Sequence, residues 1–113
     1  MPYSINGQDT AIHEPDLQEG TLWVPLRGIA ESLGGTVDWD PDNRVAIAYL
    51  GANIATLKEG DNSADINGEK SELQEAPHLK DGEMWVPVRF FNLIGQQVGV
   101  DLGSKQVDIT TVS

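Results

Sequence analysis

The same run of residue types occurs twice along the chain, and this internal repeat constrains the fold more than any other feature of the sequence. INGQDTAIHEP from Ile5 is followed 61 residues later by INGEKSELQEAP from Ile66. WVPLRGIAESLGGTVDWD from Trp23 is matched 62 residues later by WVPVRFFNLIGQQVGVD from Trp85, with one residue fewer between the Arg and the Gly. RVAIAYL and QVDITTV then close the two copies. Duplication of one folding unit is the simplest interpretation, because so long an offset does not fit a solenoid.

The repeat predicts one domain of the α+β class, in which each copy packs antiparallel strands and hairpins around one short α-helix. The first copy covers about residues 2–51 and the second about residues 64–113, and a connector that contains a strand of its own joins them. A chain of 113 residues is long enough to bury a modest core without disulfides or a structural metal.

Turn signals divide each copy into strands. Asn6-Gly7 and Asn67-Gly68 each supply two successive residues that tolerate positive φ, as the tight turn of a two-residue hairpin requires. Asp40-Pro41-Asp42-Asn43 has the composition of a longer turn. Between these and similar turns, strands are expected at residues 2–5, 8–13, 36–39, 44–50, 52–58, 64–66, 69–74, 97–100 and 106–112.

A short amphipathic helix is expected after each Trp-Val-Pro segment, because proline suits the first helical turn and apolar residues then recur at helical spacing. In the first copy they recur at i, i+3, i+4 and i+7, and Gly34 with Gly35 ends the helix. The expected buried residues there are Leu26, Ile29, Ala30 and Leu33. The second helix is expected from Pro87 to Ile94, with Gly95 after it and with expected inner residues Val88, Phe91 and Ile94.

The composition excludes several classes of partner. With 18 acidic and 7 basic residues the formal net charge is −11, which disfavours nucleic acid and anionic membranes. No stretch approaches the roughly 20 apolar residues of a membrane span. The absence of cysteine excludes disulfides, thiolate metal ligands and a thiol nucleophile. Met1 to Ser4 lack the basic and apolar segments of a secretion signal, so the chain is expected either in the cytoplasm or as a segment of a longer exported protein.

The combination of WVPLR, a helix ending in LGG, VDWD, NGE and a second WVPVR resembles the copper amine oxidase N-terminal-like domain, the stalk domain of many bacterial surface and secreted proteins. The resemblance covers roughly residues 5–112. It implies a five-stranded antiparallel sheet wrapped around a helix, in a unit that sits apart from the catalytic copper domain. It therefore implies no copper and no other cofactor.

Three residue pairs recur at corresponding places and are assigned to structure: Trp23 with Trp85, Pro25 with Pro87, and Arg27 with Arg89. Core packing is the favoured role of the two tryptophans, and stacking on the sugar rings of a glycan is the alternative.

The two arginines lie near the positive end of a helix, where a cation is slightly disfavoured. An ion pair would offset this, and the expected partners are Asp40 for Arg27 and Asp101 for Arg89. Binding of an anionic ligand is the alternative role.

A ligand-binding surface is expected where the copies differ. Trp39 and the turn after it belong to the first copy only, whereas the second copy has Phe90 and the shorter helix. If the domain binds glycan or peptide, the expected contacts combine an aromatic face with side-chain hydrogen-bond acceptors. These contacts are Trp39, Asp40, Asp42 and Asn43.

No metal site and no catalytic site are predicted. Asp38, Asp40 and Asp42 resemble the start of an EF-hand loop, but the required Gly and Glu are missing, so a solvated turn is favoured over weak calcium binding. His13 and His78 are the only histidines, and two imidazoles do not define a zinc or copper site. No nucleophile, base and orienting group can be combined from the motifs present.

The leading hypothesis is a non-catalytic stalk or attachment module of a bacterial cell-surface or wall-associated protein, which binds glycan or a neighbouring domain. The first alternative is a stand-alone adaptor that recruits a protein partner by strand addition at an exposed sheet edge. The second alternative, a small metal-dependent hydrolase, has no motif in its favour.

Overall fold

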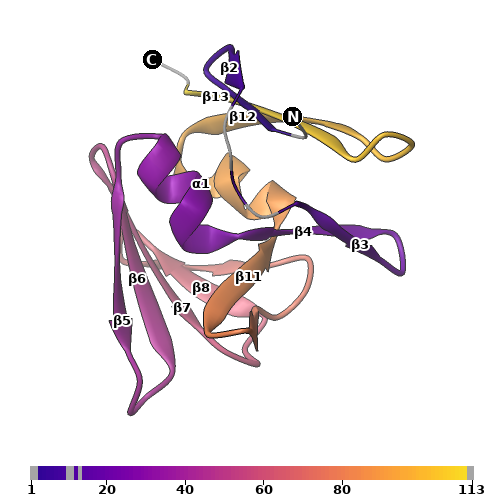
Figure 1. Cartoon of the computed structure of the whole chain (residues 1–113). Coiled ribbons are helices and arrows are strands. Elements are labelled where there is room, and N and C mark those ends of the chain that lie inside the picture. The colour runs from indigo at the N-terminus through magenta and orange to yellow at the C-terminus, as the bar shows by residue number, and fades with distance from the viewer. Residues whose placement is uncertain (1–2, 10–11, 13, 112–113) are drawn as a thin grey trace.

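The computed structural model describes residues 3–9, 12 and 14–111, in which strands far outnumber helices (Figure 1). The fold is α+β as predicted, but mostly β, with two short helices between antiparallel sheets. In Figure 1 both helices lie in the middle of the molecule, with one sheet above them and another below and to the left. No helix among the described residues is long and apolar enough to cross a membrane.

The strands form three sheets. The five-stranded sheet is antiparallel and has the order β5 (Thr36–Asp40), β6 (Val45–Leu50), β7 (Asn53–Lys58), β8 (Ser63–Ile66) and β9 (Glu69–Glu72). The central sheet has the order β10 (His78–Lys80), β11 (Glu83–Pro87), β4 (Thr21–Pro25) and β3 (Asp16–Gln18). The terminal sheet has the order β12 (Gln96–Asp101), β13 (Gln106–Thr111), β1 (Tyr3–Ile5) and β2 (Gln8–Asp9), with β1 parallel to β13.

The hairpins at the two Asn-Gly pairs are present, with Asn6 at φ 51° and Asn67 at φ 55°. The strands predicted after the helices are also present, within two residues at their ends. Part of the strand predicted at 8–13 falls on residues 10, 11 and 13, which lie outside the described residues.

The central sheet is absent from the sequence prediction, which has only loops leading into the helices at these residues. In the structure β4 and β11 pair antiparallel, with Trp23 opposite Pro87, Val24 opposite Val86 and Pro25 opposite Trp85. Each of these strands also pairs with its own neighbour, β4 with β3 and β11 with β10, through hairpins that turn at residues 19–20 and 81–82. The β4–β11 pairing is the one that joins the two copies, so that pairing has no local signal. Proline also lowers strand propensity, which hides such short strands from pattern recognition.

The first helix, α1 (Leu26–Ser32), packs against β5 and β6 and against the central sheet. Leu26, Ile29 and Ala30 are buried as predicted, whereas Leu33 is only half-buried because it lies at the end of the helix. The full core role expected for Leu33 is therefore wrong. A Leu33→Ala change should cost less than the about 2–5 kcal/mol of a fully buried leucine.

The second helix, η1 (Val88–Ile94), is a 3-10 helix and not the α-helix that the sequence predicts. Its predicted inner residues, Val88, Phe91 and Ile94, are buried, and Gly95 follows it in the left-handed conformation. These inner residues recur every third position, and side chains three apart share one face when a helix has three residues per turn. The helix type thus agrees with the spacing of these three residues, although Phe90 is buried as well.

One hydrophobic core joins the inner faces of the sheets and both helices. The helix η1 packs mainly on β12, and α1 on the five-stranded sheet, so each sheet flanking the centre covers one helix. Among the large apolar residues of this core, the most completely buried are Tyr3, Val24, Leu26, Ile29, Leu57, Val86, Phe91, Ile94, Val107 and Ile109.

Candidate functional site

Trp23 and Trp85 lie on the face of the central sheet that points away from Val24 and Val86, because side chains alternate along a strand. Both tryptophans are nevertheless buried, with exposed fractions of 7% and 5%. The ring of Trp23 lies 4.4 Å from that of His78, and the Lys80 ammonium lies 5.1 Å from the centre of the Trp85 ring. The tryptophans therefore act as core side chains and offer no open face to a sugar.

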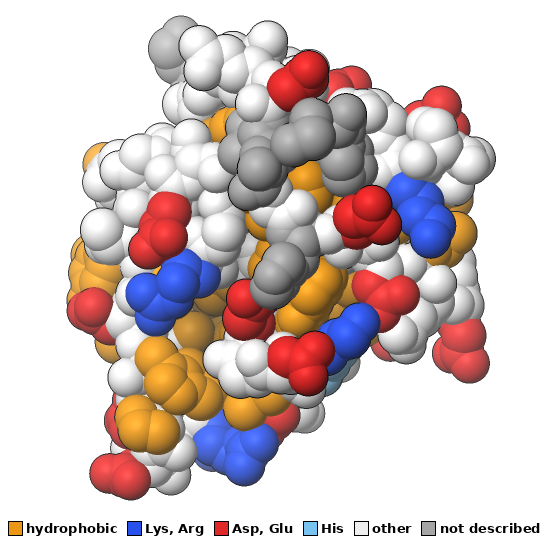
Figure 2. All heavy atoms as spheres, viewed as in Figure 1, with side chains coloured by type: hydrophobic (Ala, Val, Ile, Leu, Met, Phe, Trp, Pro, Cys, Tyr) orange, Lys and Arg blue, Asp and Glu red, His pale blue; other side chains and the backbone are white. Residues whose placement is uncertain are grey.

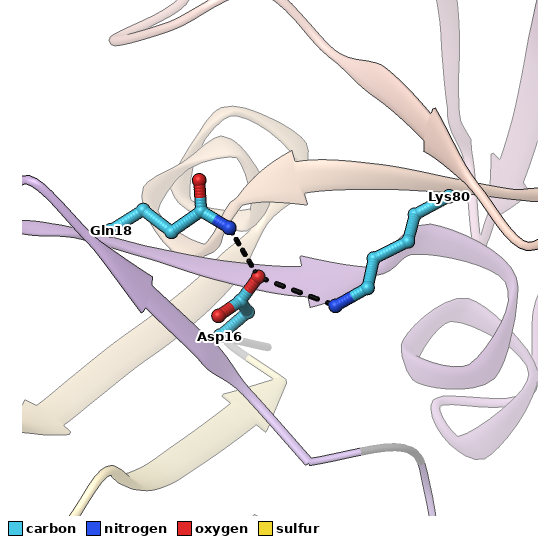
Figure 3. A network of polar contacts seen from close by, with 3 residues as sticks. All are labelled: Asp16, Gln18 and Lys80. Atoms are coloured by element: carbon cyan, nitrogen blue, oxygen red, sulfur yellow. Dashed lines mark hydrogen bonds and ion pairs between the residues drawn. The ribbon is translucent and has the colours of Figure 1, made fainter.

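A polar network closes the surface beside these tryptophans (Figure 3). The Asp16 carboxylate accepts hydrogen bonds from Gln18 Nε2 at 2.6 Å and from Lys80 Nζ at 3.4 Å. These contacts connect β3 with β10, the two edge strands of the central sheet. Lys80 thus contacts both the Asp16 carboxylate and the Trp85 ring, and these two contacts hold its ammonium group near the Trp85 ring.

The ion pairs expected for the repeated arginines are wrong. Arg27 Nη1 lies 3.7 Å from Glu31 Oε2, one helical turn away, and not beside Asp40. Asp101 Oδ1 accepts a hydrogen bond from the Gly103 backbone N–H at 3.0 Å. Arg89 is exposed, and within the described part of the chain nothing pairs with it. A carboxylate four residues after the arginine, present in the first copy only, accounts for this difference.

The predicted ligand-binding turn is ordered by its own side chains. Asp40 Oδ1 accepts hydrogen bonds from the backbone N–H groups of Asp42 and Asn43, at 3.1 and 3.3 Å. Asp40 Oδ2 accepts one from Asn43 Nδ2 at 2.8 Å. Trp39 is half-buried and packs against the core. The four residues lie together at one end of β5, but the Asp40 carboxylate oxygens and Asn43 Nδ2 already have partners, and the role of these residues in ligand binding stays a prediction.

Asn43→Ala is expected to raise the pKa of Asp40. The Asn43 side chain, followed by its backbone N–H, donates the hydrogen bonds that hold the pKa of Asp40 below its usual value. A depressed carboxyl pKa stabilises the fold above the unfolded-state pKa of about 3.9, and this contribution is lost as pH falls through the lower folded pKa. NMR titration of the Asp40 carboxyl carbon measures the change, and an unaltered titration curve would contradict this assignment.

No copper or zinc binding of sub-micromolar affinity is expected. Among the described residues, which include Asp38, Asp40, Asp42 and His78, no group of three His, Asp or Glu side chains is placed to hold a metal ion. His13 lies outside the described residues. Titration calorimetry with Cu²⁺ and Zn²⁺ tests the expectation. A stoichiometric high-affinity isotherm that disappears in the double variant His13→Ala, His78→Ala would overturn it.

Two grooves lie at corresponding places in the two copies, each between the end of an edge strand and a hairpin of the central sheet. The groove of the first copy is about 50 Å³ in volume and is lined by Arg27, Trp39, Met84 and neighbouring residues. The groove of the second copy is about 200 Å³ and is lined by Gly20, Leu22, Gln74, Val88, Arg89, Val100 and Leu102. We call the second one the Arg89 groove.

The residue at one strand position explains the different volumes. Trp39 faces Ala46 across the β5–β6 hairpin, and Val100 faces Val107 across the β12–β13 hairpin, so both precede the turn by the same number of residues. Trp39 lines the smaller groove and Val100 the larger one, so the bulkier indole accounts for the smaller volume. The loss of the tryptophan in the second copy thus creates space beside an exposed arginine.

The Arg89 groove continues into a second hollow of about 280 Å³ along η1. Gln74 and Arg89 line both, and Glu72, Phe90 and Leu93 belong to the second only. Leu93 and Leu102 are among the most exposed large apolar side chains of the described residues, at 37% and 48%. Neither Leu93 nor Leu102 was predicted as a site residue. The one sequence signal for this groove is that the second copy has Val100 where the first copy has Trp39.

One face of the molecule shows how its charged side chains are distributed. Figure 2 shows acidic side chains spread over one whole face of the molecule, with basic side chains few and separate from one another. Hydrophobic side chains gather on the lower part of this face. No basic stripe is present on it that could follow a phosphate backbone.

Comparisons with known proteins agree with the motif resemblance. A curated relative from Brevibacillus choshinensis, named "Protease inhibitor", is 34% identical to the chain over 99 residues. The match covers 85% of this chain but 30% of the relative, so the chain spans less than a third of the relative's length. The family model described as "Copper amine oxidase N-terminal domain" matches residues 4–109. The chain therefore belongs to the copper amine oxidase N-terminal domain family.

Proposed function

We propose that the chain is a non-catalytic attachment module that holds a protein partner or a neighbouring domain. The observation that carries the proposal is the Arg89 groove, where an exposed arginine with no ion-pair partner among the described residues lines the same hollows as the exposed Leu93 and Leu102. Unpaired charge beside exposed apolar side chains is typical of a surface that recognises another protein.

The family and the relative support a modular role. The match to less than a third of the relative is what a module within a longer protein produces. The proposal includes a place outside a bacterial cell, on an exported protein, and treats residues 1–113 as one domain of two duplicated copies. Superposition of residues 2–51 on 64–113 tests the duplication.

Glycan binding has less support than protein binding. Two of the three tryptophans are buried, so Trp39 is the remaining tryptophan that could stack on a sugar, and it is half-buried. The neighbouring Asn43 side chain already donates a hydrogen bond to the Asp40 carboxylate. Stacking on a hexose requires an open aromatic face, which the buried pair does not provide.

Retention on cell-wall material separates the two ligand classes. We expect the purified chain to be retained on walls that keep their proteins and to be lost from walls stripped of protein by a protease. Retention on stripped walls that Trp39→Ala abolishes, with folding verified by circular dichroism, would establish glycan binding instead. No retention on either material would favour the stand-alone adaptor.

Protease binding is a second candidate, because the matched relative is named a protease inhibitor. Under this candidate the protein partner is itself a protease. Adding the chain in excess to purified proteases of the serine, cysteine and metal-dependent classes tests it. Saturable inhibition of peptide hydrolysis in one class supports the candidate, and unchanged hydrolysis in all three refutes it.

A further inference from the structure

We propose that the Arg89 groove binds an extended peptide segment of a protein partner, with an acidic side chain at Arg89 and apolar side chains on either side of it. This inference rests on the proposed attachment function and specifies the surface and the chemistry of the partner.

Charge argues for an acidic side chain at the centre of the bound segment. Of the described residues that line the Arg89 groove, Arg89 is the only charged one. Its counterpart Arg27 is already 3.7 Å from Glu31, whereas the residue four positions after Arg89 is Leu93. A guanidinium without a protein carboxylate offers charge-assisted hydrogen bonds to one supplied by a partner.

The apolar side chains on both sides of Arg89 argue for apolar neighbours in the ligand. Leu102 is half-exposed and lines the Arg89 groove, and Leu93 lines the adjoining hollow that shares Arg89. Glu72 also lines the hollow with Leu93, so a second acidic side chain is disfavoured there. The proposed ligand therefore has its carboxylate at Arg89 and an apolar residue at Leu93.

The sheet edge beside the groove argues for an extended backbone. Val100 belongs to β12, which is an edge strand of the terminal sheet and, among the described residues, pairs with β13 alone. Its six residues, Gln96–Asp101, include no proline and no lysine, which are two devices that protect natural edges. In Figure 1 the hairpin of β12 and β13 and the hairpin of β3 and β4 extend to the same side of the molecule. A peptide in the groove can therefore add to β12 as a further strand.

The corresponding edge strand of the first copy, β5, also lacks proline and lysine, but it differs in charge and in the groove beside it. It carries two acidic residues, Asp38 and Asp40, where β12 carries only Asp101, and Trp39 lines the smaller first-copy groove. The first copy therefore supplies a matched control within the same protein. Residues of the Arg89 groove can therefore be tested against their first-copy counterparts, Arg89 against Arg27 and Val100 against Trp39.

Fluorescence polarisation with two pools of labelled nonapeptides tests the inference. Both pools alternate valine and leucine with serine, and they differ only in a central glutamate or a central lysine. We expect the glutamate pool to bind the wild-type chain and the lysine pool not to bind. Arg89→Glu should weaken binding of the glutamate pool by at least about tenfold, while the control Arg27→Glu should leave it unchanged.

A second set of variants tests the groove itself. Val100→Trp introduces the first-copy residue and should abolish binding, and Trp39→Val should leave binding at the Arg89 groove intact. Leu102→Asp, at an exposed position where folding is not affected, should weaken binding of the glutamate pool even if the tryptophan variant does not fold. Wild-type affinity in folded Val100→Trp or Leu102→Asp, or equal binding of both pools, would overturn the inference.

The outcome also separates this inference from the proposed function. If the wall-retention assay succeeds and Arg89→Glu is retained like the wild type, the attachment role stands and the Arg89 groove is not its site. If neither the walls nor the glutamate pool binds the chain, both proposals are wrong.

Discussion

Phe91→Ala is expected to destabilise the chain by about 3–5 kcal/mol, as truncation of a fully buried phenylalanine does. Phe91 has an exposed fraction of 0% and lies on the inner face of η1. Its ring contacts Phe90 edge-to-face, with ring centres 5.1 Å apart. Small domains have a total stability of about 5–15 kcal/mol, so this one change removes a large part of it.

Urea denaturation followed by tryptophan fluorescence measures the effect. The control is Leu93→Ala on the same helix, because Leu93 is 37% exposed and its removal leaves no closed cavity. A surface change of this kind should stay within about 0.5–1 kcal/mol. Equal costs for the two variants would show that η1 does not bury its Phe91 face as described.

Gly35→Ala is expected to cost about 3 kcal/mol, although its backbone conformation suits any residue. A Cβ atom at position 35 would lie 2.3 Å from the backbone oxygen of Tyr49 and 3.0 Å from Leu50 Cδ1. Tyr49 is held on both sides by the neighbouring strands β5 and β7, so its backbone cannot retreat without breaking the sheet. Overpacking of this kind costs about 1–3 kcal/mol, and a backbone contact belongs at the upper end of that range.

The neighbouring Gly34 separates two reasons for requiring glycine. Gly34 has φ +89°, but a Cβ atom there would meet nothing within 4 Å. Gly34→Ala should therefore show only the cost of the left-handed conformation, about 1 kcal/mol after the entropy gained by replacing glycine. Thermal unfolding of both variants measures the difference. A larger loss for Gly34→Ala than for Gly35→Ala would contradict the close approach of Gly35 to β6.

Local features of the structure could be predicted from the sequence. The Asn-Gly turns at residues 6–7 and 67–68 require positive φ, and this requirement lies within the turn itself. The apolar spacing of the two helices differs, with i, i+3, i+4, i+7 in the first and i, i+3, i+6 in the second. The α-helix predicted for each copy is present in the first copy and wrong in the second, where the helix is 3-10, while the predicted buried face of the second helix is confirmed.

The partners of charged residues could not be predicted, because they depend on where side chains point in three dimensions. The expected pairs of Arg27 with Asp40 and Arg89 with Asp101 follow from the repeat alone. In the structure Asp40 is bonded within its turn, and Arg27 lies on the exposed face of α1 beside Glu31. Local hydrogen bonds from Asp or Asn to nearby backbone compete successfully with a distant ion pair.

By itself, the sequence determined the family, the hairpins, the two helical segments and the buried face of each helix. Only the tertiary structure decided the pairing of β4 with β11, since Trp85 finds Pro25 across an interval of the chain that no local pattern spans. The same is true of the Arg89 groove, whose lining comes from β4, η1, β12 and the segment after β9. The physical reason is that turn and helix preferences act within a few residues, whereas a sheet edge and a groove exist only after distant segments have packed.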